Sequence, residues 1–382
     1  MSSNGSTRTP GPLPKAVQDA YALSGTRSGG RTPAVEPPAR AARAGVLVPT
    51  CDRVAFFEQA LRSAREQTWA ETEILVLDNG ETRGAEELAV AAGDPRVRYV
   101  RNPENLGLIG SIRKGMGLFS ESVAWCTILP DDDLLDRGFI RSMLGHVEKH
   151  ADLDVVEGRR VLIGPAGEPL SESPVPPGPA SATDYLVSRS QFRRQAFLAG
   201  VFFSRKAYEA IGGYPPLATG MASDDALIFA LALRRGLHCN AEATAFVRMH
   251  PDAESHSAAN AVGNIRSFGD FRRYVSAKAR ACPSLTRAEV RTVERTAKRY
   301  TEASINEFWI RRCRDLLRAR GPESRRALGE LYALGLDLRY PFSARYRLSA
   351  LFGRLLRVHL ERSPGYGRFW DGLLRLRARA RS

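Results

Sequence analysis

The chain's most constraining feature is an alternation of short apolar runs with amphipathic helical segments, which begins abruptly at residue 44. The run 44–50 suits a buried parallel strand, and a helix with Phe56, Phe57, Ala60, Leu61 and Ala64 on one face follows it. The pattern then predicts strands at 73–78, 97–100 and 125–129, and helices at 86–92, 108–119 and 137–150. Such alternation predicts an α/β fold with a doubly wound, mainly parallel sheet.

The rest of the chain divides by composition. Residues 1–43 are rich in Pro, Gly, Ser and Arg, which indicates a disordered basic arm. Residues 162–184 predict a long loop or lid, and the α/β domain is expected to span 44–264. It should contain strands at 197–204 and 245–249, an ordered segment at 205–211 and a helix at 224–235. After residue 265 every periodic segment is helical, so 265–382 is predicted to be a helical region, with helices at 286–300, 301–318, 344–360 and 364–378.

Charge separates the two main parts. The net charge of +14 combines +4 over residues 1–43 and −7 over 44–264 with +17 over 265–382. Three interpretations of the basic region stay open: peripheral binding to an anionic membrane, packing on the catalytic domain or in a homodimer, and recognition of an acidic acceptor. The absence of a DNA- or RNA-reading motif argues against nucleic acid as a partner.

Cysteine spacing and hydropathy bear on location. The five cysteines show no paired spacing, and no window of 18 apolar residues or secretory signal pattern occurs. We therefore expect a reducing, cytoplasmic location, with the inner face of the membrane as the site of any peripheral association.

Polar residues end three of the predicted strands. They are Thr50 after Pro49, the pair Asp78-Asn79, and the run Asp131-Asp132-Asp133. Ligands of such sheets bind beyond the carboxyl ends of the strands, so these residues should face one crevice. Adjacent carboxylates repel unless they are solvated or bind a cation, and Mg²⁺ and Mn²⁺ prefer oxygen ligands. The run therefore indicates either a solvated acidic turn or a divalent metal site.

Other segments add candidate contacts. Asp78-Asn79 is either an ordinary turn or a recognition pair for the imide edge of uracil or the donors of another base. Asn105 and Gly107, followed by Lys114, indicate a helix start near phosphates, or a plain glycine-containing one. Asp224-Asp225 is a general base or a pair favoured by the helix dipole. His250 is a late metal or phosphate ligand, or a structural histidine.

The ordered series of these motifs resembles the family 2 glycosyltransferases of GT-A fold. It runs through Val-Pro-Thr-Cys-Asp-Arg, Ile-Leu-Val-Leu-Asp-Asn-Gly, Asn-Leu-Gly and Leu-Pro-Asp-Asp-Asp to Ile-Gly-Gly-Tyr, Ser-Asp-Asp and Arg-x-His-Pro, over about residues 44–260. The resemblance implies that Asp78, with Asn79, binds the nucleotide base. It also implies that Asp131 and Asp133 hold the metal, with Asp132 turned toward the donor sugar, and that Asp225 is the usual base.

Two departures from the family pattern leave choices open. The family often has Asp-Asp where this chain has Asp78-Asn79, and Glu-Asp where it has Asp224-Asp225, so either acid of the second pair is a candidate base. The sequence thus predicts a metal-dependent, inverting glycosyltransferase that uses a nucleotide-diphosphate sugar, UDP being the commonest nucleotide, and an unknown acceptor. The alternative is a catalytically degenerate domain that serves as a basic scaffold or membrane-surface protein.

Overall fold

The computed structural model describes residues 43–150, 152–174, 178–250, 260–319 and 322–337, together with residues 342, 347, 348, 350 and 351. These residues form two compact units. The first takes its described residues from Met1–Pro216, Ser223–Pro251 and Tyr274–Val293, and the second from Leu217–Ala222, Asp252–Arg273 and Glu294–Ser382.

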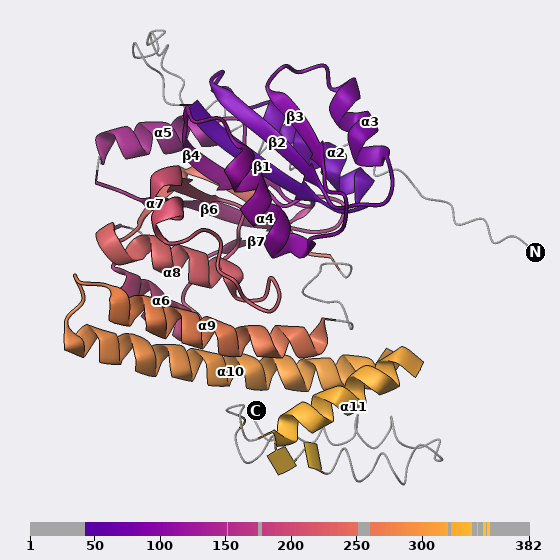
Figure 1. The fold of residues 1–382 in the computed structure, drawn as a ribbon, viewed down its shortest axis with the longest axis vertical. Coiled ribbons are helices and arrows are strands. Elements are labelled where there is room, and N and C mark those ends of the chain that lie inside the picture. The colour runs from indigo at the N-terminus through magenta and orange to yellow at the C-terminus, as the bar shows by residue number, and fades with distance from the viewer. Residues whose placement is uncertain are drawn as a thin grey trace, which may run out of the picture. The chain divides into compact units, whose positions relative to one another are not determined.

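A mixed sheet forms the centre of the first unit (Figure 1). Its strands are β1 (Arg43–Thr50), β2 (Thr72–Asp78), β3 (Val97–Arg101), β4 (Val123–Ile128), β5 (Leu134–Leu135), β6 (Val155–Ile163), β7 (Pro169–Ser173), β8 (Val201–Ser204) and β9 (His238–Arg248). They lie in the order β3-β2-β1-β4-β8-β6-β9-β5, and β7 pairs with β6. The first four strands are parallel, whereas β8 is antiparallel to both of its neighbours. The carboxyl ends of β1, β2 and β4 therefore meet at one edge.

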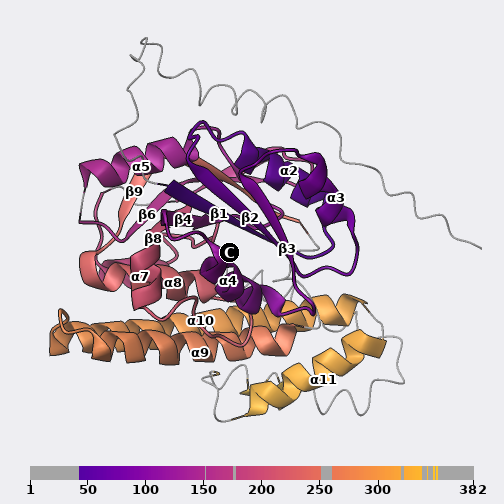
Figure 2. The ribbon, with the colours of Figure 1, turned by 45° about the horizontal axis from the view of Figure 1, so that its top comes forward.

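Helices cover both faces of this sheet. They are α2 (Val54–Arg65), α3 (Gly84–Ala91), α4 (Gly107–Leu118), α5 (Phe139–Lys149), α6 (Ala182–Ser190), α7 (Arg205–Ala210) and α8 (Ser223–Arg235). Figure 2 shows α2, α3 and α5 on one face and α4, α7 and α8 on the other. This two-sided cover explains why the central strands are apolar throughout.

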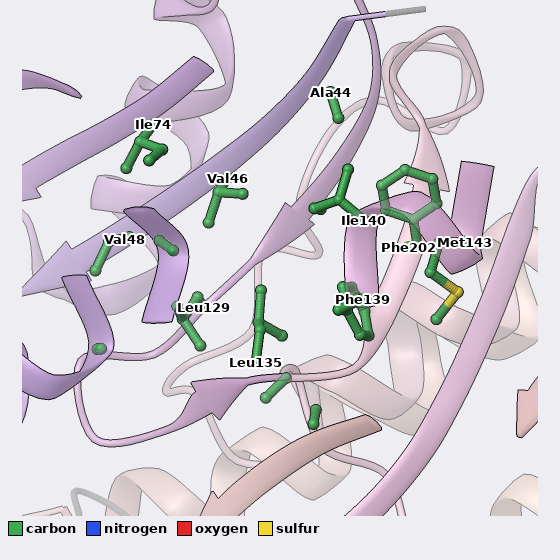
Figure 3. Close-up of a cluster of buried hydrophobic side chains, with 14 of the residues drawn as sticks. Ala44, Val46, Val48, Ile74, Leu129, Leu135, Phe139, Ile140, Met143 and Phe202 are labelled. Atoms are coloured by element: carbon green, nitrogen blue, oxygen red, sulfur yellow. The ribbon is translucent and has the colours of Figure 1, made fainter. Parts of the chain in front are cut away.

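Alternate residues of β1 point to opposite faces of the sheet and pack against the helices on each face. Ala44, Val46 and Val48 pack with Phe139 and Met143 of α5 in the buried cluster of Figure 3. Leu47 points to the opposite face, toward α4. A Cβ at Gly115 of α4 would lie 2.5 Å from a methyl carbon of Leu47, so glycine permits the close approach of this helix.

The predicted α/β fold is confirmed, and each strand and helix expected between residues 44 and 150 is present. The loop expected over 162–184 is wrong in part, since β7 and the start of α6 lie within it. Strand β6 was not predicted, because it contains buried charged residues and so is not a continuous apolar run. Arg160 lies 3.0 Å from one oxygen of Glu157, and Arg194 lies 3.3 Å from the other.

Long helices make up most of the described part of the second unit. They are α9 (Ala261–Ala281) and α10 (Arg287–Ala319), both shared with the first unit, and α11 (Pro322–Leu336). The ring centroids of Phe268 and Phe308 are 6.2 Å apart, and Trp309 Nε1 donates to the carbonyl of Leu331. The two helices predicted over 286–318 are one continuous helix, α10.

Some predictions concern segments beyond these helices. The helix predicted at 344–360 and the arm at 1–43 lie almost entirely outside the described residues, and the helix at 364–378 lies wholly outside them. Among the helices that the structure describes, none is both long and apolar enough to cross a membrane.

Candidate active site

The carboxyl ends of β1 and β4 are joined by Asp131. Its Oδ2 accepts hydrogen bonds from Thr50 Oγ1 at 2.9 Å and from the Cys51 backbone N–H at 3.3 Å. Asp131 follows β4 and Thr50 ends β1, and both side chains are buried. Asp131 therefore fixes the loop after β4 against the loop after β1.

Arg53 bridges two of the three adjacent aspartates. Its guanidinium lies 2.8 Å from Asp131 Oδ1 and 2.7 Å from Asp132 Oδ2. The Arg53 side chain is about one-third exposed (32%), so one cation at the mouth of the site neutralises part of the acidic run. A guanidinium presents several donors in a fixed plane, which suits this bridging position.

The end of β9 completes the acidic site. His250 Nε2 lies 3.0 Å from Asp132 Oδ2, and Arg248 Nε donates to the backbone carbonyl of Asp132. The backbone N–H of Arg248 donates to Asp133 Oδ1 at 2.8 Å. The rings of Phe56 and His250 are 5.0 Å apart, so α2 and β9 hold the imidazole from two sides.

The three carboxyl groups differ in electrostatic environment. Burial raises the pKa of Asp131 to about 6, with a further contribution from Asp132. Burial and the Asp132 charge raise the pKa of Asp133 well above its usual value. Burial also acts on Asp132, but the His250 hydrogen bond and the Arg53 charge outweigh it, and the pKa of Asp132 is lowered. Of the three carboxyl groups, Asp132 is therefore the one whose ionised form its surroundings stabilise.

The donor set of this site fits a divalent metal. Asp132 offers the most exposed carboxylate of the three, and the His250 imidazole nitrogen lies beside it. The oxygens of Asp131 are occupied by Thr50, Cys51 and Arg53, and one oxygen of the deeply buried Asp133 accepts from Arg248. Of the predicted metal ligands, His250 thus meets Asp132 directly, while Asp131 and Asp133 bind the surrounding protein.

A second set of polar side chains follows β2. Asp78 is buried, and it accepts from Tyr99 Oη at 2.7 Å and from the Gly80 backbone N–H at 2.7 Å. The loop after β1 packs against the loop that follows Asp78, because Asp52 accepts a hydrogen bond from the backbone N–H of Thr82 at 2.9 Å. A Cβ at Gly80 would lie 2.6 Å from Asp52 Oδ1, so this close contact between two loops requires glycine.

Asn79 organises the loop that opens α4. Its Oδ1 accepts from Asn102 Nδ2 at 2.7 Å, and its Nδ2 donates to the carbonyl of Gly107 at 3.2 Å. Lys114 Nζ donates to Asn102 Oδ1 at 2.6 Å. Asn105 accepts from the N–H of Gly107, whose φ of 66° favours glycine. The hydrogen bonds of Asn79 and Lys114 therefore fix the conformation of this loop.

The two predicted nucleotide-binding segments are in contact with each other. Asn105 Nδ2 lies 3.7 Å from Cys51 Sγ, and Cys51 also donates to Asp131. Pro49 is buried in β1 beside Leu77 of β2. The structure thus brings Thr50, Asp78, Asn79, Asn105, Gly107, Asp131 and Asp132 to one edge of the sheet.

The acidic pair at the start of α8 has two different environments. Arg189 of α6 forms a bidentate ion pair with Asp225, and Tyr185 Oη donates to Asp225 Oδ1 at 2.9 Å. Asp224 is half-buried and accepts from Ser223 Oγ at 3.3 Å. Burial, followed by the neighbouring Asp225 charge, raises the pKa of Asp224 to about 6.

Several residues that contact the predicted site residues were not predicted from the sequence. Arg53, Tyr99, Arg189 and Arg248 carry none of the predicted roles, although Arg53 and Arg248 stand inside motifs that the sequence singles out. Their roles depend on pairings between positions far apart in the chain, such as the 189 positions that separate Gln59 from its partner Arg248. A single sequence gives no signal for such pairings.

Comparisons with known proteins bear on the fold and on part of the chain. Residues 45–204 match the model of glycosyl transferase family 2. The S. aureus TarS fragment 1–349 in complex with UDP is similar in structure, with a TM-score of 0.54 and 12% identity, covering 82% of this chain and 87% of that chain. The same fragment with UDP-GlcNAc gives a TM-score of 0.52 at 12% identity and the same coverage. A search of curated proteins finds no match.

The likeness to these fragments shows a fold of GT-A type, and the strand-end acids lie within the part of the chain that matches the glycosyl transferase family 2 model. The match over residues 45–204 to the model of glycosyl transferase family 2 bears out the resemblance seen in the motifs. That span includes Asp78 and the Asp131–Asp133 run, whereas Asp224, Asp225 and His250 follow it.

Proposed function

We propose that the chain transfers a sugar from a nucleoside-diphosphate donor to an acceptor nucleophile, with a divalent metal held by Asp132 and His250. The observation that carries the proposal is the 3.0 Å approach of these two side chains, which joins the residues after β9 to the loop after β4, in a chain whose residues 45–204 match the family 2 model. A mixed oxygen and nitrogen donor set favours Mn²⁺ over Mg²⁺, which takes oxygen ligands. When bound, the metal neutralises the departing diphosphate.

The neighbouring acids position Asp132 in this proposal. Asp131 ties the loop to Thr50, and Asp133 ties it to the backbone of Arg248. Both carboxyl groups have raised pKa values because of burial. Asp132 is the more exposed carboxylate and lies beside His250, which favours it as the ligand over Asp131 and Asp133, the ligands that the family resemblance implies.

Arg53 is the residue that we expect to exchange partners. In the structure its guanidinium neutralises Asp131 and Asp132 at the exposed mouth of the site. Asp132 would exchange the Arg53 guanidinium for a divalent cation, and the guanidinium would find a new partner in a diphosphate. Arg53 then binds the diphosphate of the donor and orients it toward the sugar-transfer step.

Asp224 is proposed as the general base. Both oxygens of Asp225 are engaged by Arg189, so Asp225 has little capacity to take a proton. Asp224 has a pKa of about 6, which suits a base that works near neutral pH. The acceptor oxygen bonds to the anomeric carbon, the bond from that carbon to the diphosphate breaks, and the acceptor proton passes to Asp224. A direct displacement of this kind inverts the anomeric configuration.

The donor is proposed to be a UDP-sugar. Asp78 ends β2 next to Asn79, whose amide donates to the Gly107 carbonyl. Each Asp78 oxygen accepts one hydrogen bond, from Tyr99 or from Gly80, and a carboxylate oxygen has a second lone pair that can accept the imide N–H of uracil. The TarS fragment of similar fold was solved with UDP and with UDP-GlcNAc. The acceptor, membrane binding by the basic helices and dimer formation stay predictions.

The test is donor hydrolysis by the full chain with UDP-GlcNAc, UDP-glucose and GDP-mannose, with and without Mn²⁺. We expect nucleoside diphosphate release that requires the metal, together with a metal-dependent rise in melting temperature when the donor binds. If no donor is hydrolysed and none shifts the melting temperature with Mn²⁺, the proposal fails and the scaffold alternative is favoured.

A further inference from the structure

Three histidine rings gather at the end of β9 that is remote from the candidate active site. His146 and His150 belong to the last turn and the C-terminal boundary of α5, and His238 begins β9. Figure 2 shows β9 beside α5, and these two elements are in contact. At about 3.3 Å per residue, β9 separates His238 from Arg248 by roughly 30 Å. The cluster is therefore distinct from the Asp132–His250 site.

The rings are close enough to share one ion. The ring centroids are 4.6 Å apart for His146 and His150, 4.9 Å for His150 and His238, and 5.6 Å for His146 and His238. One ligand nitrogen from each ring lies within 4.8 Å of the other two. Histidines four positions apart on a helix face the same side, and the third ligand comes from the neighbouring strand.

We propose that His146, His150 and His238 form a second metal site that binds Zn²⁺ and clamps the end of α5 to the start of β9. Three imidazoles with an open fourth position are a donor set that Zn²⁺ accepts. The carboxylate site at Asp132 has the harder ligand, so the two sites differ in metal preference.

The state of the rings supports ligation. His146 Nε2 is buried, and it has no hydrogen-bond partner within the described parts of the chain. Burial, with the neighbouring histidines, lowers the pKa of His146, and Lys149 adds to this effect while Glu242 opposes it. Burial and His150 likewise lower the pKa of His238. Neutral imidazole is the form that binds metal.

Little movement closes the site. Zn–N distances of about 2.0–2.1 Å in a tetrahedral site place the nitrogens roughly 3.4 Å apart. The nitrogens here are at most 4.8 Å apart, and the His150 side chain is exposed. A hydrogen bond from Asn240 Nδ2 to the carbonyl of Ser142 already joins β9 to α5, so the backbone is held in place while the rings close.

The experiment is calorimetric titration of Zn²⁺ into the metal-free full chain and into H238Q and H150Q. We expect two classes of site in the native chain, since Zn²⁺ also meets Asp132 and His250. Each histidine variant should lose one class, or bind it at least about 10-fold more weakly. Zn²⁺ should raise the melting temperature of the native chain and raise that of H238Q less.

Two matched controls make the result decisive. E148A changes an exposed neighbour on α5 and should keep both classes of site. D132N removes the charge of the active-site carboxylate and should keep the histidine class. H238Q leaves the helical pair His146 and His150 intact, so Zn²⁺ binding by folded H238Q and H150Q as tight as in the native chain overturns the three-ligand site. This test is independent of sugar transfer, because its readout is binding and melting temperature.

Discussion

His250 and Asp132 are 118 positions apart in the sequence, and their Nε2 and Oδ2 atoms lie 3.0 Å apart in the structure. The contact joins the end of β9 to the loop after β4. It places an imidazole nitrogen beside the only one of three adjacent carboxylates whose pKa is lowered. This pair gives the acidic run a chemical asymmetry that the sequence Asp-Asp-Asp does not show.

Removal of either member of the pair should remove metal-dependent activity. We expect D132N and H250Q to lose several kcal/mol of transition-state stabilisation, which is a loss of about 100-fold or more in donor hydrolysis. The Mn²⁺ dependence of the melting temperature should disappear in both variants. D152N is the matched control, because Asp152 is an almost fully exposed acid and should keep native activity. Native Mn²⁺ binding by D132N would contradict the assignment.

The pH profile should report Asp224. Its raised pKa means that the carboxyl is protonated below about pH 6 and ionised above it. A base must be ionised to accept a proton, so kcat/KM should rise with pH through about 6 and then level off. D224N should lower kcat by about 10²–10⁴-fold and lose this limb of the profile, while donor binding stays near native. A native profile in D224N would exclude Asp224 as the base.

The sequence predicted most of the first unit because its signals are local. Buried parallel strands such as β1 are short apolar runs, and the polar residues that end them share one sheet edge by topology alone. Local pattern therefore sufficed for Thr50, Asp78 and Asp131. It failed at β6, where Glu157 and Arg160 are buried and pair with each other, so the strand does not read as apolar.

Long-range pairings were beyond prediction for a different reason. The partner of Asp132 on β9 and the partner of Asp225 on α6 are fixed by packing, which a single sequence does not display. The histidine cluster shows both cases. The spacing of His146 and His150 is a recognisable helical pair, whereas His238 joins them only through the contact of β9 with α5.

Asp225 should act mainly on stability. Its carboxylate is buried and forms a bidentate ion pair with the largely buried Arg189. D225N leaves the guanidinium without its counter-charge, which costs about 3–5 kcal/mol for a buried pair. Urea unfolding should show this loss for D225N and a much smaller one for D224N. Equal stability of the two variants would mean that the ion pair contributes little.

Glu157 offers the sharpest test of the buried charges. Its carboxylate contacts Arg160 and Arg194, and all three side chains are at most 1% exposed. E157Q should destabilise the unit by about 3–5 kcal/mol, because two buried guanidinium groups lose their counter-charge. The control is E172Q, which removes an exposed ion pair with Arg159 and should cost less than about 1 kcal/mol. Urea unfolding followed by circular dichroism measures both variants, and a similar midpoint for E157Q and E172Q would show that β6 tolerates the loss of its buried charge.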